Sequence, residues 1–324
     1  MSVKLGVFLD LRNPARWARP WNRHYAAALE AIEEVERLGG GGAWVTEHHL
    51  FEDGYVPQPL TFLAAAAART TEIRLGTAIV VAPLRHPRHI AEEAAVVDLV
   101  SGGRLELGLG AGYHRAEFEA FGADVDRRMA DTESATIAVR DLLWGGTLRP
   151  PPVQDRLPVW LGHQGPVGAR RAGRLGVGLL STDPALLDPY RAGLAEAGLD
   201  PAVARMGGLV PLIVAEDPER TAHRLAPHLA HQLDSYARAK AGDGAPDPVP
   251  SDPEELAAEV LRPDTSGLAV RTVEAAVDLL RERSAGLPVE HLYLWGSVAG
   301  MPDELVAEHI GLAFGQVAPR LEAA

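Results

Sequence analysis

Short apolar runs alternate with segments of helical periodicity along almost the whole chain. The apolar runs, each of strand length, lie at 3–9, 43–46, 73–82, 105–109, 159–162, 177–180, 209–215 and 291–295. Helical spacing or helix-terminating residues mark 25–38, 60–69, 89–99, 129–144, 167–175, 184–197, 218–239, 272–283 and 302–317. This alternation predicts a parallel α/β sheet. Eight units in 324 residues favour a single (β/α)8 TIM barrel over residues 1–324 rather than a doubly wound open sheet.

One segment departs from this alternation. Residues 240–270 contain a stretch rich in Gly, Pro and Asp at 241–253, and they carry no clear strand or helix pattern of their own. Such a segment is too long for an ordinary barrel loop, and long loops are usually lids, binding loops or insertions. We therefore expect residues 240–270 to be an insertion that forms a mobile cover over the mouth of the barrel.

Composition and charge exclude several classes of protein. The formal net charge of −13 argues against binding to nucleic acid or to anionic membranes. The chain has no cysteine, which excludes disulfides, thiolate catalysis and cysteine-ligated metals. No apolar run has the length of a transmembrane helix, and the N-terminus lacks the features of a signal peptide. We expect a cytoplasmic protein that does not contact a membrane.

Candidate catalytic residues follow the second strand, as Glu47, His48 and His49. In a parallel barrel the carboxyl ends of the strands carry the chemistry. Because neighbouring residues on a strand end point in opposite directions, only one of the two histidines should face the pocket. The sequence offers no third ligand in register, so we expect no metal site. The alternatives for these histidines are packed side chains, and Glu47 could orient a histidine or pair with an arginine.

Two glycine-containing turns follow later strands. The run from Gly108 to Tyr113 lacks the G-x-G-x-x-G spacing of a dinucleotide turn, but its glycines permit close approach of the backbone to a ligand. After the fifth strand, Gly162 to Gly168 opens a helix. Free N–H groups at a helix N-terminus bind anions, so this turn is a candidate phosphate site. The alternative is an ordinary loop.

These motifs, in their order and spacing, resemble the bacterial luciferase-like family of flavin-dependent monooxygenases. The matching residues are Glu47-His48-His49, Gly76-Thr77-Ala78, Pro83, His86-Pro87, Ala91-Glu92-Glu93, Asp98, Ser101-Gly102-Gly103-Arg104, Gly108 to Tyr113, Pro158 to Gly162 and a pattern over 291–302. They run from near residue 3 to near residue 319. We interpret His86-Pro87, Asp98 and Arg104 as architectural, with Asp98 and Arg104 forming a pair.

The resemblance implies a flavin site. His48 corresponds to an active-site histidine near the reactive edge of the flavin, and Glu47 lies beside it. A non-prolyl cis peptide that supports the flavin corresponds to Ala78–Ile79. Further cofactor contacts correspond to Gly110, Ala111, Tyr113 and either Arg128 or its neighbour Arg127, and the flavin phosphate to Gln164, Gly165 and Gly168. This chain has Ala111 where many relatives have an arginine, and no Ser or Thr hydroxyl in the phosphate turn.

The resemblance also implies the reaction and its partners. It implies an oxidoreductase that uses reduced FMN and O₂ to oxygenate a small or medium organic substrate, such as an intermediate of secondary metabolism, with a separate flavin reductase. Trp17 and His231 are candidate substrate contacts. The alternatives are that Trp17 only packs beneath the 240–270 cover and that His231 lies on a solvated helix face. A homodimer is expected through 63–68 and 91–100. Two alternatives stay open: hydride transfer with the deazaflavin F420, and a non-catalytic flavin-binding relative.

Overall fold

The parallel barrel expected from the sequence is present in the computed structural model, which describes residues 3–241, 246 and 248–322. A nine-stranded sheet has the order β3-β2-β1-β11-β8-β7-β6-β5-β4, and pairing of β3 with β5 closes it. Because β3 and β4 are two pieces of one barrel position, the closed barrel has eight positions. The strands are β1 (Lys4–Leu9), β2 (Gly42–Val45), β3 (Arg74–Thr77), β4 (Val80–Val81), β5 (Leu105–Gly110), β6 (Val159–Leu161), β7 (Gly178–Leu180), β8 (Met206–Val210) and β11 (Val289–Trp295).

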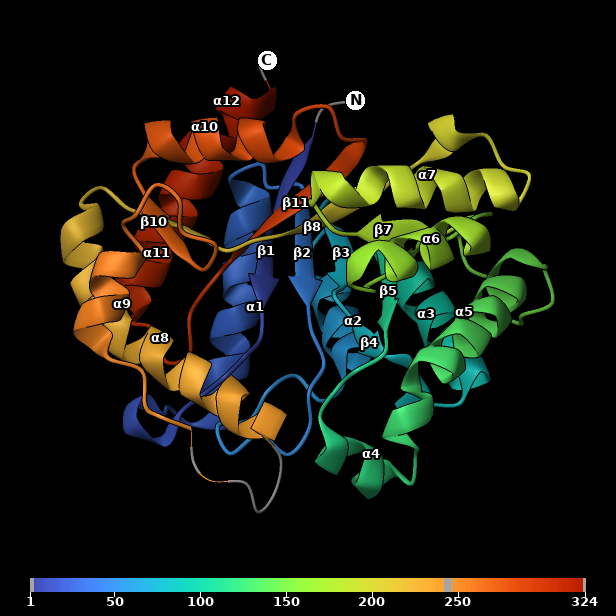
Figure 1. The fold of residues 1–324 in the computed structure, drawn as a ribbon, viewed down its shortest axis with the longest axis horizontal. Coiled ribbons are helices and arrows are strands. Elements are labelled where there is room, and N and C mark those ends of the chain that lie inside the picture. The colour runs from blue at the N-terminus through green and yellow to red at the C-terminus, as the bar shows by residue number, and fades with distance from the viewer. Residues whose placement is uncertain (1–2, 242–245, 247, 323–324) are drawn as a thin grey trace.

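Helices surround this barrel on its outer face (Figure 1). They are α1 (Trp21–Arg37), α2 (Pro59–Arg69), α3 (Pro87–Ser101), α4 (Arg115–Phe121), α5 (Arg128–Trp144), α6 (Gly165–Leu175), α7 (Leu187–Glu196), α8 (Pro218–Ala241), α9 (Pro253–Glu259), α10 (Val273–Ser284), α11 (Asp303–Leu312) and α12 (Ala318–Glu322). The strand arrows in Figure 1 point toward the end of the molecule where α4 lies, and the start of β1 and α12 lie at the opposite end. Polar strand-end residues therefore gather near α4.

Large aromatic side chains fill the barrel interior. Phe8, Trp44, Trp160 and Tyr293 form one buried cluster, and the ring of Trp44 stacks on Tyr293 with centroids 4.8 Å apart. Glycines make room for the indoles: a Cβ at Gly76 would lie 2.2 Å from the ring of Trp44. The interior is thus a packed core, as expected for a barrel of this size, and ligands must bind at its mouth.

The predicted boundaries differ from the structure in a few places. The third predicted strand is interrupted at Ala78–Ile79, and the seventh is divided at Pro211, after which β9 (Leu212–Val214) leaves the barrel. Proline cannot donate a ladder hydrogen bond, which accounts for the second break. The short helix α4 is a further element, with seven residues, that sequence periodicity did not indicate.

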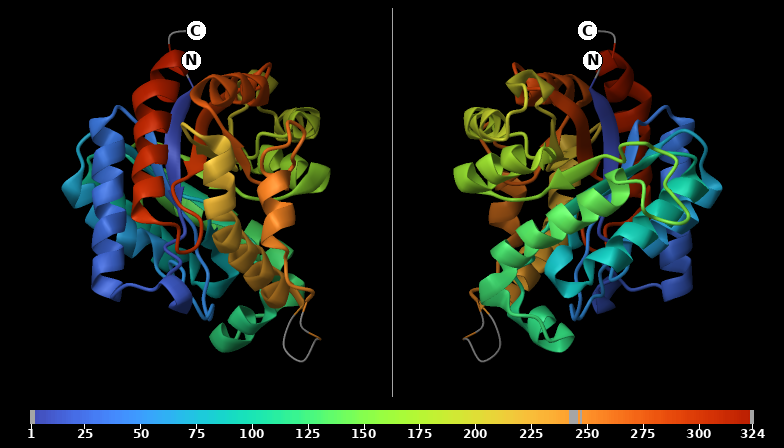
Figure 2. Two further views of the ribbon diagram at one scale, coloured as in Figure 1. Left: turned by 90° about the vertical axis from the view of Figure 1, so that its left-hand side faces the viewer. Right: turned by 90° about the vertical axis from the view of Figure 1, so that its right-hand side faces the viewer.

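The 240–270 insertion is more ordered than predicted. Helix α8 extends to Ala241, α9 packs beside it, and β10 (Ala269–Arg271) pairs in parallel with β9 (Figure 2). An apolar cluster that includes Ile213, Leu225, Leu229 and Val270 joins these elements. Part of the segment thus forms regular elements that its sequence pattern did not indicate. Residues 242–245 and 247 lie outside the described residues, and a covering role for the segment stays a prediction.

Arg104 and Asp98 are architectural, but the expected pair between them does not form. The Arg104 guanidinium donates to the carbonyl oxygens of Ser101, Ala67, Thr70 and Ile73 and to the Thr70 hydroxyl, at 2.6–3.0 Å. Asp98 instead accepts from the amides of Val153 and Gln154 and from the Gln154 side chain. Arg104 is thus satisfied by groups at the ends of α2 and α3 and before β3, and Asp98 by the loop before β6. Each buried charge has its own set of partners and does not need the other.

Candidate active site

A cavity of about 350 Å³ opens at the carboxyl ends of β2, β4, β5 and β6. Its lining residues are Thr46, Glu47, His48, Ile79, Val81, Ala111, Gly112, Tyr113, Arg128, Met129, Gly162, His163 and Gln164. This volume lies within the range of small-molecule and cofactor sites. The sequence-predicted residues Glu47, His48, Ile79, Ala111, Tyr113, Arg128 and Gln164 all line it. The fold therefore brings together residues that are more than a hundred positions apart.

His48 is held by a buried carboxylate from α4. Its Nδ1 lies 2.9 Å from Oε1 of Glu117, and the same oxygen accepts the His49 N–H at 2.7 Å. Glu117 is fully buried. Burial alone would raise the pKa of Glu117, but the hydrogen bond and charge of His48 and the His49 amide lower it from its ordinary value. An ionised carboxylate only accepts hydrogen bonds, so Nδ1 of His48 carries a proton. In neutral His48, Nε2 is then the free acceptor.

The local sequence explains how Glu117 reaches this position. After β5, Gly112 has a φ of +66°, which lets the chain turn, and His114 precedes the first turn of α4. Phe118 then anchors α4 in an apolar cluster with Val81 and Val125. The anchored helix directs the preceding residue, Glu117, toward the end of β2. Glu117 lies 69 positions from His48, and no local pattern in the sequence connects the two.

Aromatic rings enclose His48 on several sides. Its ring centroid lies 4.9 Å from Phe51, 4.8 Å from Tyr55 and 5.2 Å from Tyr113. Such rings exclude water and fix the plane of the imidazole. Packing of this kind supports proton transfer by a histidine in one orientation.

Glu47 and His49 form a separate network that faces away from His48. Glu47 Oε1 lies 2.9 Å from Nε2 of His49 and accepts from Arg85 at 2.8 Å, while Oε2 accepts the Val81 N–H at 2.9 Å. His49 does not line the cavity. One of the two histidines thus faces the pocket and the other faces outward, as the strand geometry predicts. Both alternatives for Glu47, a histidine partner and an arginine partner, occur together.

The Ala78–Ile79 peptide bond is cis in the structure. Ile79 follows this bond and lines the cavity, whereas Ala78 packs on the aromatic core of the barrel. A Cβ at Gly110 would lie 2.5 Å from the Ile79 side chain, and a Cβ at Gly162 would lie 2.7 Å from it. These glycines therefore accommodate Ile79, and Gly110 itself is not among the lining residues of the cavity.

The first turn of α6 follows Gln164, the last residue of the chain to line the cavity. Gln164 precedes the helix without a side-chain cap, so the amides of Gly165 and Val167 lack helix partners, whereas the amide of Gly168 is the first that bonds within the helix. Arg128 also lines the cavity, and its guanidinium donates to the Val125 carbonyl at 2.9 Å. Its neighbour Arg127 is exposed and pairs with Asp131 instead. The predicted phosphate residues Gly165 and Gly168 do not themselves line the cavity, but the helix N-terminus and Arg128 give this part of the site a positive character.

His163 is a lining residue that the sequence reasoning did not single out. Its side chain is buried, and neither ring nitrogen has a partner among the described residues. Burial lowers the pKa of His163 to about 4, and the charge of Arg171 acts in the same direction. A neutral imidazole with unpaired nitrogens beside the cavity is a candidate hydrogen-bonding group for a ligand. Its position directly after the fifth strand was the available signal.

Trp17 and His231 lie together, but outside the lining of this cavity. The Trp17 ring is 6.1 Å from His231, and Nε2 of His231 lies 2.8 Å from Oδ2 of Asp53. That oxygen also accepts from Nε of the buried Arg12 at 2.8 Å. A second contact between the hydroxyls of Tyr55 and Tyr236 joins the same loop to α8. These groups tie α8 to the barrel mouth, and substrate contact by Trp17 or His231 stays a prediction.

The comparison with known families decides the relationship of this chain. The family model described as luciferase-like monooxygenase matches residues 3–286. The chain belongs to the luciferase-like monooxygenase family. This agrees with the barrel, with the cavity at its carboxyl end and with the cis bond after β3.

Individual relatives in the luciferase-like family support the same relationship. Limonene 1,2-monooxygenase of Rhodococcus erythropolis is 29% identical over 350 aligned positions that cover 93% of this chain and 87% of that protein. The crystal structure of monooxygenase RslO1 from Streptomyces bottropensis has a TM-score of 0.83 and 25% identity, over 98% of this chain and 99% of that one. An F420-dependent secondary alcohol dehydrogenase shares the fold, with a TM-score of 0.75 and 21% identity over 99% of each chain. The chain spans 29%, 66% and 30% of the length of the first three curated relatives that it matches.

Within residues 3–241, 246 and 248–322, no helix is both long and apolar enough to cross a membrane. Across the same residues, no group of three or more His, Asp or Glu side chains could hold a metal ion.

Proposed function

We propose that this protein is a flavin-dependent monooxygenase that uses reduced FMN and O₂ to oxygenate a small or medium organic molecule. The observation that carries the proposal is a cavity with two chemically different sets of lining groups. One set is the His48–Glu117 pair among aromatic rings, and the other is Arg128 with the free amides that follow Gln164. A molecule with a redox-active ring and a phosphate group matches both sets.

The residues present fit FMN, with one difference from many relatives. The amides of Gly165 and Val167 and the charge of Arg128 would hold the phosphate, and Ile79 and Ala111 would contact the ring system. The unpaired nitrogens of His163 are available to the ribityl or phosphate oxygens. Ala111 supplies no charge where relatives have an arginine, which leaves Arg128 as the arginine in the cavity lining.

The protein groups have separate tasks in this proposal. Reduced FMN, when bound, supplies the electrons for activation of O₂. His48, oriented by Glu117, accepts or returns a proton at Nε2. The rings of Phe51, Tyr55 and Tyr113 keep water away from that nitrogen. Because the sequence contains no dinucleotide fingerprint, we propose that a separate reductase delivers the reduced flavin.

The second candidate function is F420-dependent hydride transfer on the same fold. Ala111 is the observation that favours F420. Many FMN-binding relatives have an arginine for the flavin phosphate at this position, and this cavity has an alanine there. The shared fold with an F420-dependent secondary alcohol dehydrogenase is consistent with it.

We also propose that the protein is a homodimer through α2 and α3. Those helices pack together, and α3 exposes Val96 and Val100, with 47% and 49% of their surface accessible. Exposed apolar side chains on neighbouring turns suit a symmetric helix interface. The molar mass from light scattering tests this interface. The parent protein should have the mass of a dimer and the V96D/V100D variant that of a monomer. A variant that remains a dimer would exclude this interface.

The phosphate end of the site makes a prediction about affinity. FMN should bind at least about tenfold more tightly than riboflavin, because charge-assisted hydrogen bonds contribute about 1.5–3 kcal/mol each. Arg128→Ala should remove most of this preference and leave riboflavin binding unchanged. Arg127→Ala is the matched control, since that neighbour pairs with Asp131 on the surface. Fluorescence titration of the parent protein and both variants, each with FMN and with riboflavin, measures it. Equal affinities for FMN and riboflavin in the parent protein would contradict the phosphate assignment.

A further inference from the structure

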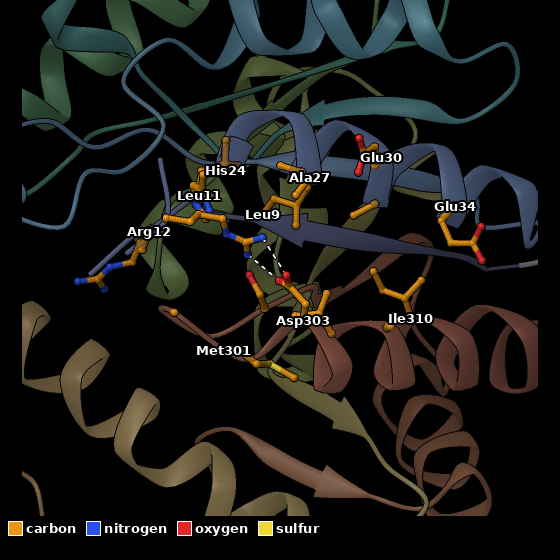
Figure 3. Close-up of a pocket in the computed structure, with 17 residues that line it drawn as sticks. Leu9, Leu11, Arg12, His24, Ala27, Glu30, Glu34, Met301, Asp303 and Ile310 are labelled. Atoms are coloured by element: carbon orange, nitrogen blue, oxygen red, sulfur yellow. Dashed lines mark hydrogen bonds and ion pairs between the residues drawn. The ribbon is translucent and has the colours of Figure 1, made fainter. Parts of the chain in front are cut away.

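A second cavity, of about 460 Å³, lies outside the barrel between α1 and α11. Its inner side is closed by the carboxyl end of β1 with the residues that follow it, and by the loop after β11. These segments contribute Leu9, Leu11 and Ser297. It shares no lining residue with the cavity at the barrel mouth. Figure 3 shows Ala27, Glu30 and Glu34 on one side and Asp303 and Ile310 on the other. The proposed monooxygenase reaction does not use this space.

The cavity exists because the facing side chains of the two helices are too small to meet. Helix α1 contributes Ala27, Ala28 and Ala31, which lie on one face at i, i+1 and i+4. Helix α11 contributes Val306 and Ala307 opposite them. Buried Leu9, Leu11, Met301 and Ile310 complete an apolar floor. Because Ala27, Ala28 and Ala31 are only half-buried, the cavity is open to solvent on one side and presents apolar surface that a ligand could cover.

One polar side chain inside this apolar wall lacks a full set of partners. Both ring nitrogens of His24 are shielded from solvent and make no hydrogen bond of good geometry among the described residues, although the imidazole lies beside the backbone of Leu11. Burial lowers the pKa of His24, and the Leu11 backbone opposes this shift. A neutral imidazole offers one donor and one acceptor, and the Leu11 carbonyl can take only the donor. The group that completes His24 must therefore be able to donate a hydrogen bond.

Charges around the cavity exclude an anionic ligand. Arg19 is already neutralised by Asp303, at 2.8 Å (Figure 3). Arg12 is among the lining residues, but its guanidinium leads away to Asp53. The remaining charged lining residues, Glu30 and Glu34, are acidic. A carboxylate or phosphate would thus meet no cation directed into the cavity, and an ammonium group would have to be desolvated beside His24 and Arg19.

We propose that this cavity binds a neutral, elongated apolar molecule with a terminal hydroxyl group, and that the hydroxyl pairs with His24. The lining of α1 runs from His24 to Glu34, a rise of about 15 Å at 1.5 Å per residue. A medium-length aliphatic alcohol matches that length, the apolar walls and the neutral polar end. The site is separate from the barrel mouth, and the proposal does not depend on the proposed reaction.

Three probes with one decyl chain test the assignment: 1-decanol, decanoate and decylamine. Isothermal titration calorimetry of the full-length protein should show one site for 1-decanol, with decanoate and decylamine at least about tenfold weaker, because a charged head group would be desolvated without a partner. Ala28→Trp should abolish the binding by filling the cavity. His24→Leu should weaken it by about 2- to 10-fold, the effect of one lost hydrogen bond.

Matched controls separate this cavity from other apolar surface. Arg23→Trp puts the same indole on an exposed position of α1 and should leave 1-decanol binding unchanged. Circular dichroism verifies folding, and Ala27→Leu is a milder filling variant if Ala28→Trp does not fold. FMN affinity should be the same in all variants. The proposal is overturned if the parent protein does not bind 1-decanol, if the filled variants bind it normally, or if either charged probe binds as tightly.

Discussion

Replacing Glu117 by alanine is expected to lower the turnover number by about 10- to 100-fold, with little change in KM or in FMN affinity. Without the carboxylate, His48 loses the partner that fixes its Nδ1 proton and its ring plane. The His49 amide also loses its acceptor. Steady-state kinetics on an accepted substrate, with flavin titration alongside, measures the effect.

Two further variants show whether Glu117 acts through His48. Glu117→Gln keeps an oxygen acceptor of the same shape, so it should retain more activity than the alanine variant. His48→Ala should lose about 10²- to 10⁴-fold, the usual contribution of a general acid or base. Adding the Glu117 change to it should cost nothing more, because residues that act as one unit are not additive. Additive losses would mean that Glu117 has a role independent of His48.

The largest effect on stability is expected at Arg104. Arg104→Met removes donors from five acceptors that lie between α2, α3 and β3, four of them backbone carbonyls. Each buried polar group left without a partner costs about 1–3 kcal/mol, so a loss of about 3 kcal/mol or more in unfolding free energy is expected. Urea unfolding monitored by circular dichroism measures this loss from the shift of the midpoint.

The control for Arg104 is a surface arginine with an ordinary ion pair. Arg37 pairs with Glu34 on the exposed face of α1. Arg37→Met should leave the midpoint unchanged, since exposed pairs contribute little. A midpoint for Arg104→Met that equals that of Arg37→Met would show that the buried network is not needed for the fold.

The sequence predicted the barrel because the alternating pattern is long and regular. The apolar runs mark all eight barrel positions, and each observed strand overlaps the expected one. The predicted strand at 73–82 was too long because side-chain hydrophobicity does not report the cis bond that separates β3 from β4. The helix α9 and the strand β10 within the insertion were missed for a related reason. Both are short, and they depend on packing against α8 and on pairing with β9.

The residue pattern alone pointed to the site where its residues follow a strand directly, and Arg128 was added by the family resemblance. His48, Tyr113 and Gln164 stand at strand ends, where the fold itself points to chemistry. Glu117 was missed because it reaches His48 from a seven-residue helix. Arg12 and Asp53 meet across 41 positions, which no local spacing indicates. Contacts of this kind depend on tertiary packing, and the local patterns of a single sequence do not predict them.

The most direct test of the central claim is an anaerobic titration of the purified apo-protein with reduced FMN and, in parallel, with reduced F420, followed by admission of air. We predict saturable binding of reduced FMN at one site per chain, markedly weaker binding of F420, and uptake of O₂ with oxidation of the bound flavin. Tighter binding of F420, with no uptake of O₂ by the complex, would contradict the monooxygenase assignment and favour hydride transfer. Failure to bind either cofactor would contradict both enzymatic functions.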